Sequence, residues 1–249
     1  MVQPILIKVS GHELDEPAYL IEFAQVIKSL SVPAVIVHGG GAEISAMQKV
    51  MGIEPRYLDG VRITDEASLK VVEMVLCGTV NKRLVRYLTA AGVDVLGMSG
   101  VDRGLVRAEK MQHPTQDMGF TGAVVSVRVE VITNLLDQGV TSVIAPVCLG
   151  EDSNFNVNAD HVAGAIAGAI EASRVVFLTN VEGVLVNGEV VNSLTPEQTH
   201  ALIADGTIFG GMIPKVQTAL HALTSGVQQA VIADLSGLQQ NRGTVFSVR

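Results

Sequence analysis

The sequence predicts an α/β protein with a parallel or mostly parallel central sheet. Short apolar runs that are typical of buried strands alternate with stretches whose apolar residues recur at helical spacing. Glycine turns follow several of these runs, as expected where strands end. The 249 residues, 48% hydrophobic and 17% charged, are enough to bury a large core and are not typical of a disordered chain.

The first half of the chain is predicted to alternate strands with helices. In order, we expect a strand over 5–9, a helix over 20–30, a strand over 34–37, a helix from 44, an irregular stretch over 55–63, and a long helix that Thr64 or Asp65 caps and Gly92 ends. Within that helix the stretch 71–76 is apolar almost all round. Such a helix lies in a core or against another subunit.

The second half continues the alternation. We expect a strand over 93–98, hairpins over 101–130 with Gly119 and Gly122 at turns, a helix from 131, strands over 142–147, 174–179 and 229–233, and a helix that opens at 210–215 and runs to about 224. Asn187-Gly188 predicts a hairpin, and Thr195 begins a capping box. No low-complexity linker marks a boundary, so any division into lobes is soft, near residues 146–156.

A glycine triplet, Gly39-Gly40-Gly41, lies between an apolar run and a helical stretch. Glycines leave backbone N–H groups uncovered, and the N-terminus of the following helix adds partial positive charge. The loop is therefore a candidate cradle for phosphate or carboxylate, although a tight strand-to-helix turn would have the same sequence. The dinucleotide fingerprint is absent, because Ile44 stands where it needs glycine, and no G-x-x-x-x-G-K-[ST] motif occurs.

Composition excludes several classes of function. The net charge of −8 argues against non-specific nucleic-acid binding. Cys77 and Cys148 lie in apolar contexts and are expected to be buried, reduced thiols rather than metal ligands. We find no signal-peptide pattern and no apolar run as long as a membrane span, and therefore expect a cytoplasmic protein without a membrane partner.

Seven stretches in order along the chain resemble the amino acid kinase family, and within it the branch that phosphorylates N-acetylglutamate. They are IKVSG (7–11), VIVHGGG (35–41), GVRIT (60–64), GTVNK (78–82), NVNAD (156–160), LTNVEGV (178–184) and GMIPK (211–215). One departure is Ser10-Gly11, where many relatives have two glycines. Serine keeps the N–H group, so the loop is expected to persist unless residue 10 is left-handed.

The resemblance implies a three-layer αβα sandwich around one mainly parallel sheet, the carbamate kinase-like fold. It implies one domain over 1–249, with an acyl-amino-acid lobe over about 1–150 and an ATP lobe over about 151–249. The implied reaction transfers the γ-phosphoryl group of ATP to the side-chain carboxylate of N-acetyl-L-glutamate, in arginine biosynthesis. Mg²⁺ would arrive on the ATP phosphates, because no His/Asp/Glu metal cage is visible in the sequence.

Matching positions also imply site residues. Lys8 and Lys215 would neutralise the transferring phosphoryl group, and Asp160 would orient both lysines. The residues implied to bind the acceptor are Gly40, Gly41, Arg62 and Asn156. Those implied to bind ATP are Lys8, Ser10, Gly11, Thr179, Asn180, Val181, Gly183, Val184, Gly211, Met212 and Lys215. This residue set suits an acceptor carboxylate, which is ionised near pH 7 and needs no general base.

Two other functions stay open at this point. One is a sister kinase of lysine or arginine synthesis, whose aminoadipate or glutamate acceptor is attached to a small acidic carrier protein. The other is a non-catalytic amino-acid or nucleotide sensor, which retention of Lys8 and Lys215 disfavours. Net charge −8 disfavours an acidic protein partner, so we expect free acetylglutamate as the acceptor. We also expect a homodimer, with 71–76 as the candidate interface.

Overall fold

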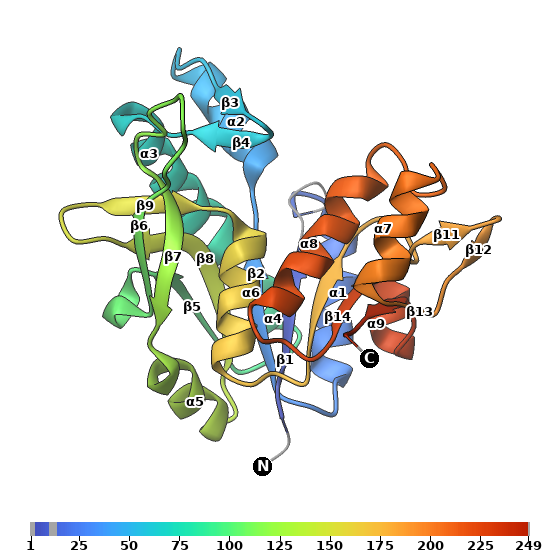
Figure 1. The fold of residues 1–249 in the computed structure, drawn as a ribbon. Helices are drawn as coiled ribbons and strands as arrows, with labels where there is room; N and C mark the ends of the chain where they lie inside the picture. Colours follow the sequence, from blue (N-terminus) through green and yellow to red (C-terminus); the bar gives the residue numbers. More distant parts are fainter. Residues whose placement is uncertain (1–2, 10–13, 249) are drawn as a thin grey trace.

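The computed structural model describes residues 3–9 and 14–248 (Figure 1). The elements up to residue 137 are β1 (Ile5–Val9), α1 (Pro17–Ser29), β2 (Ala34–His38), α2 (Gly41–Val50), β3 (Arg56–Leu58), β4 (Val61–Ile63), α3 (Glu66–Glu73), the π-helix η1 (Met74–Val80), α4 (Asn81–Ala90), β5 (Val95–Gly100), the 3-10 turn η2 (Asp102–Gly104), β6 (Val106–Lys110), β7 (Thr121–Val127) and α5 (Val129–Asp137). The remaining elements are β8 (Thr141–Leu149), β9 (Asn154–Val157), α6 (Ala159–Ala169), β10 (Arg174–Leu178), β11 (Leu185–Val186), β12 (Glu189–Val190), β13 (Ser193–Leu194), α7 (Pro196–Ala204), α8 (Met212–Thr224), β14 (Ala230–Ala233), α9 (Leu235–Gln240) and β15 (Thr244–Phe246).

One sheet runs through the described part of the molecule in the order β13-β15-β14-β10-β1-β2-β8-β6-β7-β9, with β5 beside β8. Its central strands, from β14 through β10, β1 and β2 to β8, are parallel. Antiparallel pairs join β14 to β15, β6 to β7 and β8 to β9. The predicted mainly parallel sheet is therefore confirmed, and the carboxyl ends of its central strands meet along one edge.

Helices cover both faces of this sheet, as the alternation of strand residues requires. Leu6 of β1 packs in one core with residues of α5, α6 and α8. Its neighbours Ile5 and Ile7 point the other way, into a second core with α1, α4 and α9. The expected three-layer αβα arrangement is confirmed (Figure 1).

Local signals in the sequence set several element boundaries. The Asp65 carboxylate caps α3 by accepting from the Ser68 amide at 2.8 Å. Thr195 and Gln198 form the predicted reciprocal capping box of α7. Asn187 and Gly188 both have positive φ, +54° and +84°, as the turn between β11 and β12 requires.

Two predicted features of the loops are wrong. The stretch 55–63 is not irregular, because β3 and β4 form an antiparallel hairpin around Asp59-Gly60, whose φ values are +48° and +79°. Gly122 is not at a turn but within β7, where a Cβ would lie 2.6 Å from Cβ of Phe155. Gly119 does occupy a turn position, with φ +62°.

The stretch 71–76, the candidate dimer interface, is mostly buried within its own chain. Val71, Val72, Val75 and Leu76 are at most 2% exposed and belong to the core shared with α1 and α4. Only Met74 of this stretch is largely exposed, at 51%. The helix is apolar nearly all round because it is packed within its own chain, partly as the π-helix η1.

Neither thiol is poised to react. Burial raises the pKa of Cys77 to about 11 and that of Cys148 to about 12. Cys148 is buried as predicted, whereas Cys77 is only half-buried. No helix in the described ranges has the length and apolar character needed to cross a membrane.

Candidate active site

Residues from distant parts of the chain meet at the carboxyl ends of β1, β10 and β14. They line a cavity of about 220 Å³ formed by Lys8, Asp160, Phe177, Leu178, Thr179, Gly211, Pro214, Lys215, Thr218 and Ile232. All three predicted catalytic residues, Lys8, Asp160 and Lys215, are in this set. The apolar residues wall a site that carries two ammonium groups and one carboxylate.

Lys8 and Asp160 form an ion pair within this cavity. Lys8 Nζ lies 2.8 Å from Asp160 Oδ1, and the two side chains are only 13% and 23% exposed. Asp160 stands in the first turn of α6, whose N-cap Asn158 accepts a hydrogen bond from the Asp160 amide at 2.8 Å. The carboxylate is thus stabilised by the positive end of the helix as well as by Lys8.

Lys215 stands in the first turn of α8, which opens after Gly210 (φ +56°) and Gly211. The amides of Met212 and Ile213 already donate to the carbonyls of Phe209 and Gly210, at 3.2 Å each. Among the described residues no carboxylate pairs with the Lys215 ammonium, so Asp160 pairs with Lys8 alone here. Positive charge at this end of the cavity therefore comes from Lys215 and the helix dipole.

The segment from Thr179 to Val184 is only partly in the cavity. Thr179 lines it, and its hydroxyl accepts from the Val181 amide at 3.1 Å. Val184 is fully buried, and its amide donates to Thr244 Oγ1 at 2.8 Å. Gly183 is equally enclosed, because a Cβ there would lie 2.7 Å from the same hydroxyl. Neither Asn180 nor Met212 is among the lining residues.

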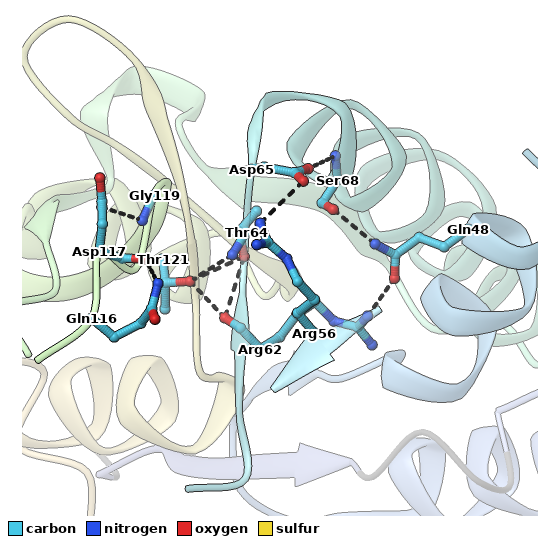
Figure 2. Close-up of polar contacts among 10 residues, drawn as sticks. All are labelled: Gln48, Arg56, Arg62, Thr64, Asp65, Ser68, Gln116, Asp117, Gly119 and Thr121. Carbon is cyan, nitrogen blue, oxygen red and sulfur yellow. Dashed lines mark hydrogen bonds and ion pairs between the residues drawn. The ribbon is translucent and has the colours of Figure 1, made fainter. Parts of the chain in front are cut away.

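Arg62 contacts the end of the glycine loop and the first turn of α2. It lies on β4, and its Nη2 donates to Gly41 O at 3.1 Å and to Ser45 Oγ at 2.8 Å. Its Nη1 donates to Gln48 Oε1 (Figure 2). The guanidinium also lies 4.8 Å from the centre of the Tyr57 ring. The hairpin that was missed from the sequence is thus what places Arg62 over the start of α2.

The charge of Arg62 has no protein counter-ion in the described ranges. The residue is 8% exposed, and its hydrogen-bond partners are all neutral. Burial lowers its pKa, although the guanidinium of arginine stays charged in proteins. A buried charge without a counter-ion is costly, so this position favours an anionic ligand. Three of the five N–H groups of the guanidinium are used by the protein, which leaves two for such a ligand.

Asn156 is linked to Arg62 through Thr64, named from the sequence only as a candidate helix cap, and Thr121, which the sequence did not single out. Asn156 Nδ2 donates to Thr64 Oγ1 at 3.0 Å. Thr121 Oγ1 donates to the Arg62 carbonyl at 2.6 Å and also lies 3.1 Å from Thr64 Oγ1 (Figure 2). Thr64 stands two residues after Arg62 in the same motif, and this closeness was the signal in the sequence that could have indicated its place in the site. Ser10 and Gly11, also predicted to bind ATP, lie outside the described residues.

His38 lies beneath the glycine loop and is fully buried. Burial, and to a smaller extent the charge of Lys82, lowers the pKa of His38 from 6.5 to about 4, against the opposing effect of its bond to Gly39. The imidazole is therefore neutral at pH 7, and its Nδ1 donates to Gly39 O at 2.9 Å. His38 thus satisfies a carbonyl of the loop backbone.

The buried imidazole should make folding stability depend on pH. Between pH 6.5 and about 4 the unfolded chain binds a proton at His38 that the native chain excludes, so the free energy of unfolding falls as the pH falls. We expect the free energy of unfolding of His38→Asn to fall by about 3 kcal/mol less than that of the wild type between pH 7 and pH 4. Urea unfolding of both proteins at pH 7 and pH 4 measures it, and equal losses in the two proteins would contradict it.

Comparisons with known proteins agree with this site. The sequence profile of the amino acid kinase family matches residues 3–234. The chain is 51% identical to the acetylglutamate kinase of Roseiflexus sp. (strain RS-1), over 98% of this chain and 94% of that one, and 46% identical to that of Chloroflexus aurantiacus (strain ATCC 29366 / DSM 635 / J-10-fl), over 97% and 96%.

Solved structures extend the likeness to the fold. The structure of smu.665 from Streptococcus mutans UA159 is 28% identical, with a TM-score of 0.83 and 99% of each chain covered. A Giardia carbamate kinase, 15% identical with a TM-score of 0.70 over the full length of both chains, shares the fold alone. The resemblance of the seven motifs is confirmed by these matches: the chain belongs to the amino acid kinase family.

Proposed function

We propose that this protein transfers the γ-phosphoryl group of ATP to the side-chain carboxylate of N-acetyl-L-glutamate, as a step of arginine biosynthesis. The observation that carries the proposal is the buried charge of Arg62 beside the glycine loop, which calls for an anionic acceptor. The two relatives named above are acetylglutamate kinases and match nearly the whole chain. A second carboxylate, the α-carboxylate of the acceptor, is the natural counter-ion of Arg62.

The proposed reaction needs no proton transfer. An oxygen of the acceptor carboxylate attacks the γ-phosphorus, the bond to the β–γ bridging oxygen breaks, and ADP leaves with the electron pair. Lys8 and Lys215 neutralise charge on the transferring group, and Asp160 keeps the Lys8 ammonium in place at 2.8 Å. Catalysis then consists of positioning and charge neutralisation.

We further propose that ATP binds with Mg²⁺ on its phosphates. Within the described ranges no three His, Cys, Asp or Glu side chains form a cluster that could hold a metal ion. The carboxylate that lines the cavity, Asp160, is engaged by Lys8. A Mg²⁺ ion held mainly by phosphate oxygens and water suits this donor set, because Mg²⁺ keeps several waters in such sites.

The two substrates are assigned to different parts of the sheet edge. Gly40 and Gly41 follow β2, Arg62 lies on β4 and Asn156 lies on β9. These residues would bind the acceptor in a lobe over about 1–150, with Asn156 at its boundary. Thr179 and Gly211, which line the cavity with Lys215, would form the ATP lobe over about 151–249. The homodimer stays a prediction, without the interface that was expected for it.

An acceptor assay tests the proposed function. ADP release should be rapid with free N-acetyl-L-glutamate and weak with glutamate, aspartate or UMP. Aminoadipate conjugated to an acidic carrier protein should also be poor, because a chain of net charge −8 repels an acidic partner. Phosphorylation of the conjugate alone would show a carrier-dependent kinase, and binding without turnover of any acceptor would show a sensor.

A further inference from the structure

An amide side chain behind the glycine loop joins three strands. Asn81, the first residue of α4, is 1% exposed. Its Nδ2 lies 2.9 Å from Val143 O on β8, 3.2 Å from Met98 O on β5, and 3.2 Å from Nε2 of His38 at the end of β2. Because β2, β8 and β5 are neighbours in the sheet, the two N–H groups of this one amide are shared among acceptors on all three strands, just before the loop begins.

The strand opposite Asn81 is shaped to receive it. Asn81 Oδ1 accepts from Lys82 Nζ at 3.0 Å, and the same ammonium donates to Gly97 O at 3.0 Å. A Cβ on Gly97 would lie 2.2 Å from Asn81 Oδ1. Gly97, inside β5, is therefore the close-approach glycine that lets the helix place its amide against the sheet.

The π-helix η1 leads directly into Asn81 and contacts the loop itself. A Cβ on Gly40 would lie 2.6 Å from Leu76 Cδ2 and 3.3 Å from Val80 Cγ2. The extra residue per turn in a π-helix changes which side chains face the sheet, and such segments are frequent at functional sites. In this chain it brings both the Gly40 contact and the Asn81 amide to the same place.

His38 connects Asn81 to the loop backbone. Its Nδ1–H donates to Gly39 O, so Nε2 is the acceptor for Asn81. The peptide unit between Gly39 and Gly40 is planar, so fixing the Gly39 carbonyl also fixes the Gly40 N–H, which points the opposite way. In the described part of the chain, neither the Gly40 nor the Gly41 amide donates to a protein acceptor.

We propose that Asn81 is a positioning residue for phosphoryl transfer, which acts through His38 to hold the Gly39–Gly40 peptide and so the direction of the loop amides. The proposal rests on the proposed function for what those amides bind. Donors that are fixed before the reaction lower its barrier more than donors that must be ordered during it. Loss of the Asn81 or His38 contact should therefore affect turnover more than ATP affinity.

Three variants test this chain of contacts in the intact protein. Asn81→Leu and His38→Leu remove a donor at similar volume, and Gly97→Ala displaces Asn81 without changing it. Each should lower kcat roughly tenfold or more, with KM for ATP nearly unchanged. In the ligand-free protein, the amides of Gly39 and Ile44, which donate to Val9 O and Gly40 O at 3.0 Å, should exchange hydrogen roughly tenfold faster.

Two further variants separate positioning from stability. His38→Asn keeps a donor near Gly39 O and should restore much of the exchange protection and kcat lost in His38→Leu. Leu88→Ala, in the buried face of α4 but remote from the loop, should lower stability without changing kcat. If Asn81→Leu fails to fold, Gly97→Ala and the comparison of His38→Leu with His38→Asn still test the proposal.

The proposal is overturned if His38→Leu keeps wild-type exchange at Gly39 and Ile44, or if His38→Asn is as impaired as His38→Leu. These outcomes are independent of the acceptor. A wild-type protein that fails to phosphorylate acetylglutamate would refute the proposed function, while the exchange rates of the ligand-free protein would still judge the positioning role.

Discussion

Replacing Lys215 or Lys8 with alanine should cut turnover of acetylglutamate by about two to three orders of magnitude while ATP still binds. Loss of one positioned donor typically costs about 3–4 kcal/mol at the transition state. Both side chains line the cavity, Lys8 at the end of a buried strand and Lys215 in the first turn of a helix. Single-turnover ADP release measures the chemical step, and calorimetric titration measures ATP affinity.

The controls for these variants differ, because their surroundings differ. Lys8→Ala removes the partner of the partly buried Asp160 carboxylate, so Lys8→Ala combined with Asp160→Asn separates lost catalysis from an uncompensated charge. Lys70→Ala is the surface control. Lys70 forms an ion pair with Glu66, and because the two side chains are 67% and 75% exposed, this pair should contribute little to stability. Turnover within threefold of wild type would remove either lysine from the mechanism.

Local patterns were sufficient to predict most of the architecture. Buried parallel strands such as β1 and β2 are nearly continuous apolar runs. The glycine loop and the capping box of α7 can each be recognised from a few consecutive residues. The hairpin over 56–63 was also coded locally, by Asp59-Gly60, and was missed because its strands are three residues long. An all-round apolar helix such as 71–76 was ambiguous, since burial in a core and burial against a subunit need the same residues.

The assembly of the candidate site depends on contacts that sequence spacing does not encode. Asn156 and Thr64 are 92 positions apart, and their bond exists only because β9 and the β4 hairpin meet in the fold. The motifs predicted that Lys8, Asp160 and Lys215 belong together, but not that, among the described residues, Asp160 would pair with Lys8 and not with Lys215. Asn81 stood within a quoted motif, yet nothing in its sequence context indicated that its amide would join three strands.

Arg62→Lys should raise KM for the acceptor roughly ten- to hundredfold and leave KM for ATP unchanged. The substitution keeps the charge but not the geometry, because a single ammonium cannot contact Gly41 O, Ser45 Oγ and Gln48 Oε1 as the two Nη groups do and still bind a carboxylate. Loss of charge-assisted hydrogen bonds of about 1.5–3 kcal/mol corresponds to this range.

A neighbouring arginine on the same hairpin gives the matched control. Arg56 is 57% exposed and lies 3.5 Å from Asp65, so Arg56→Lys should leave both Michaelis constants unchanged. Acceptor kinetics for the two variants, with melting temperatures to exclude unfolding, then isolate the buried site. If Arg62→Lys changed KM for ATP instead, or changed stability alone, the buried guanidinium would serve the hairpin rather than the acceptor, and the argument that its uncompensated charge selects an anionic substrate would fail.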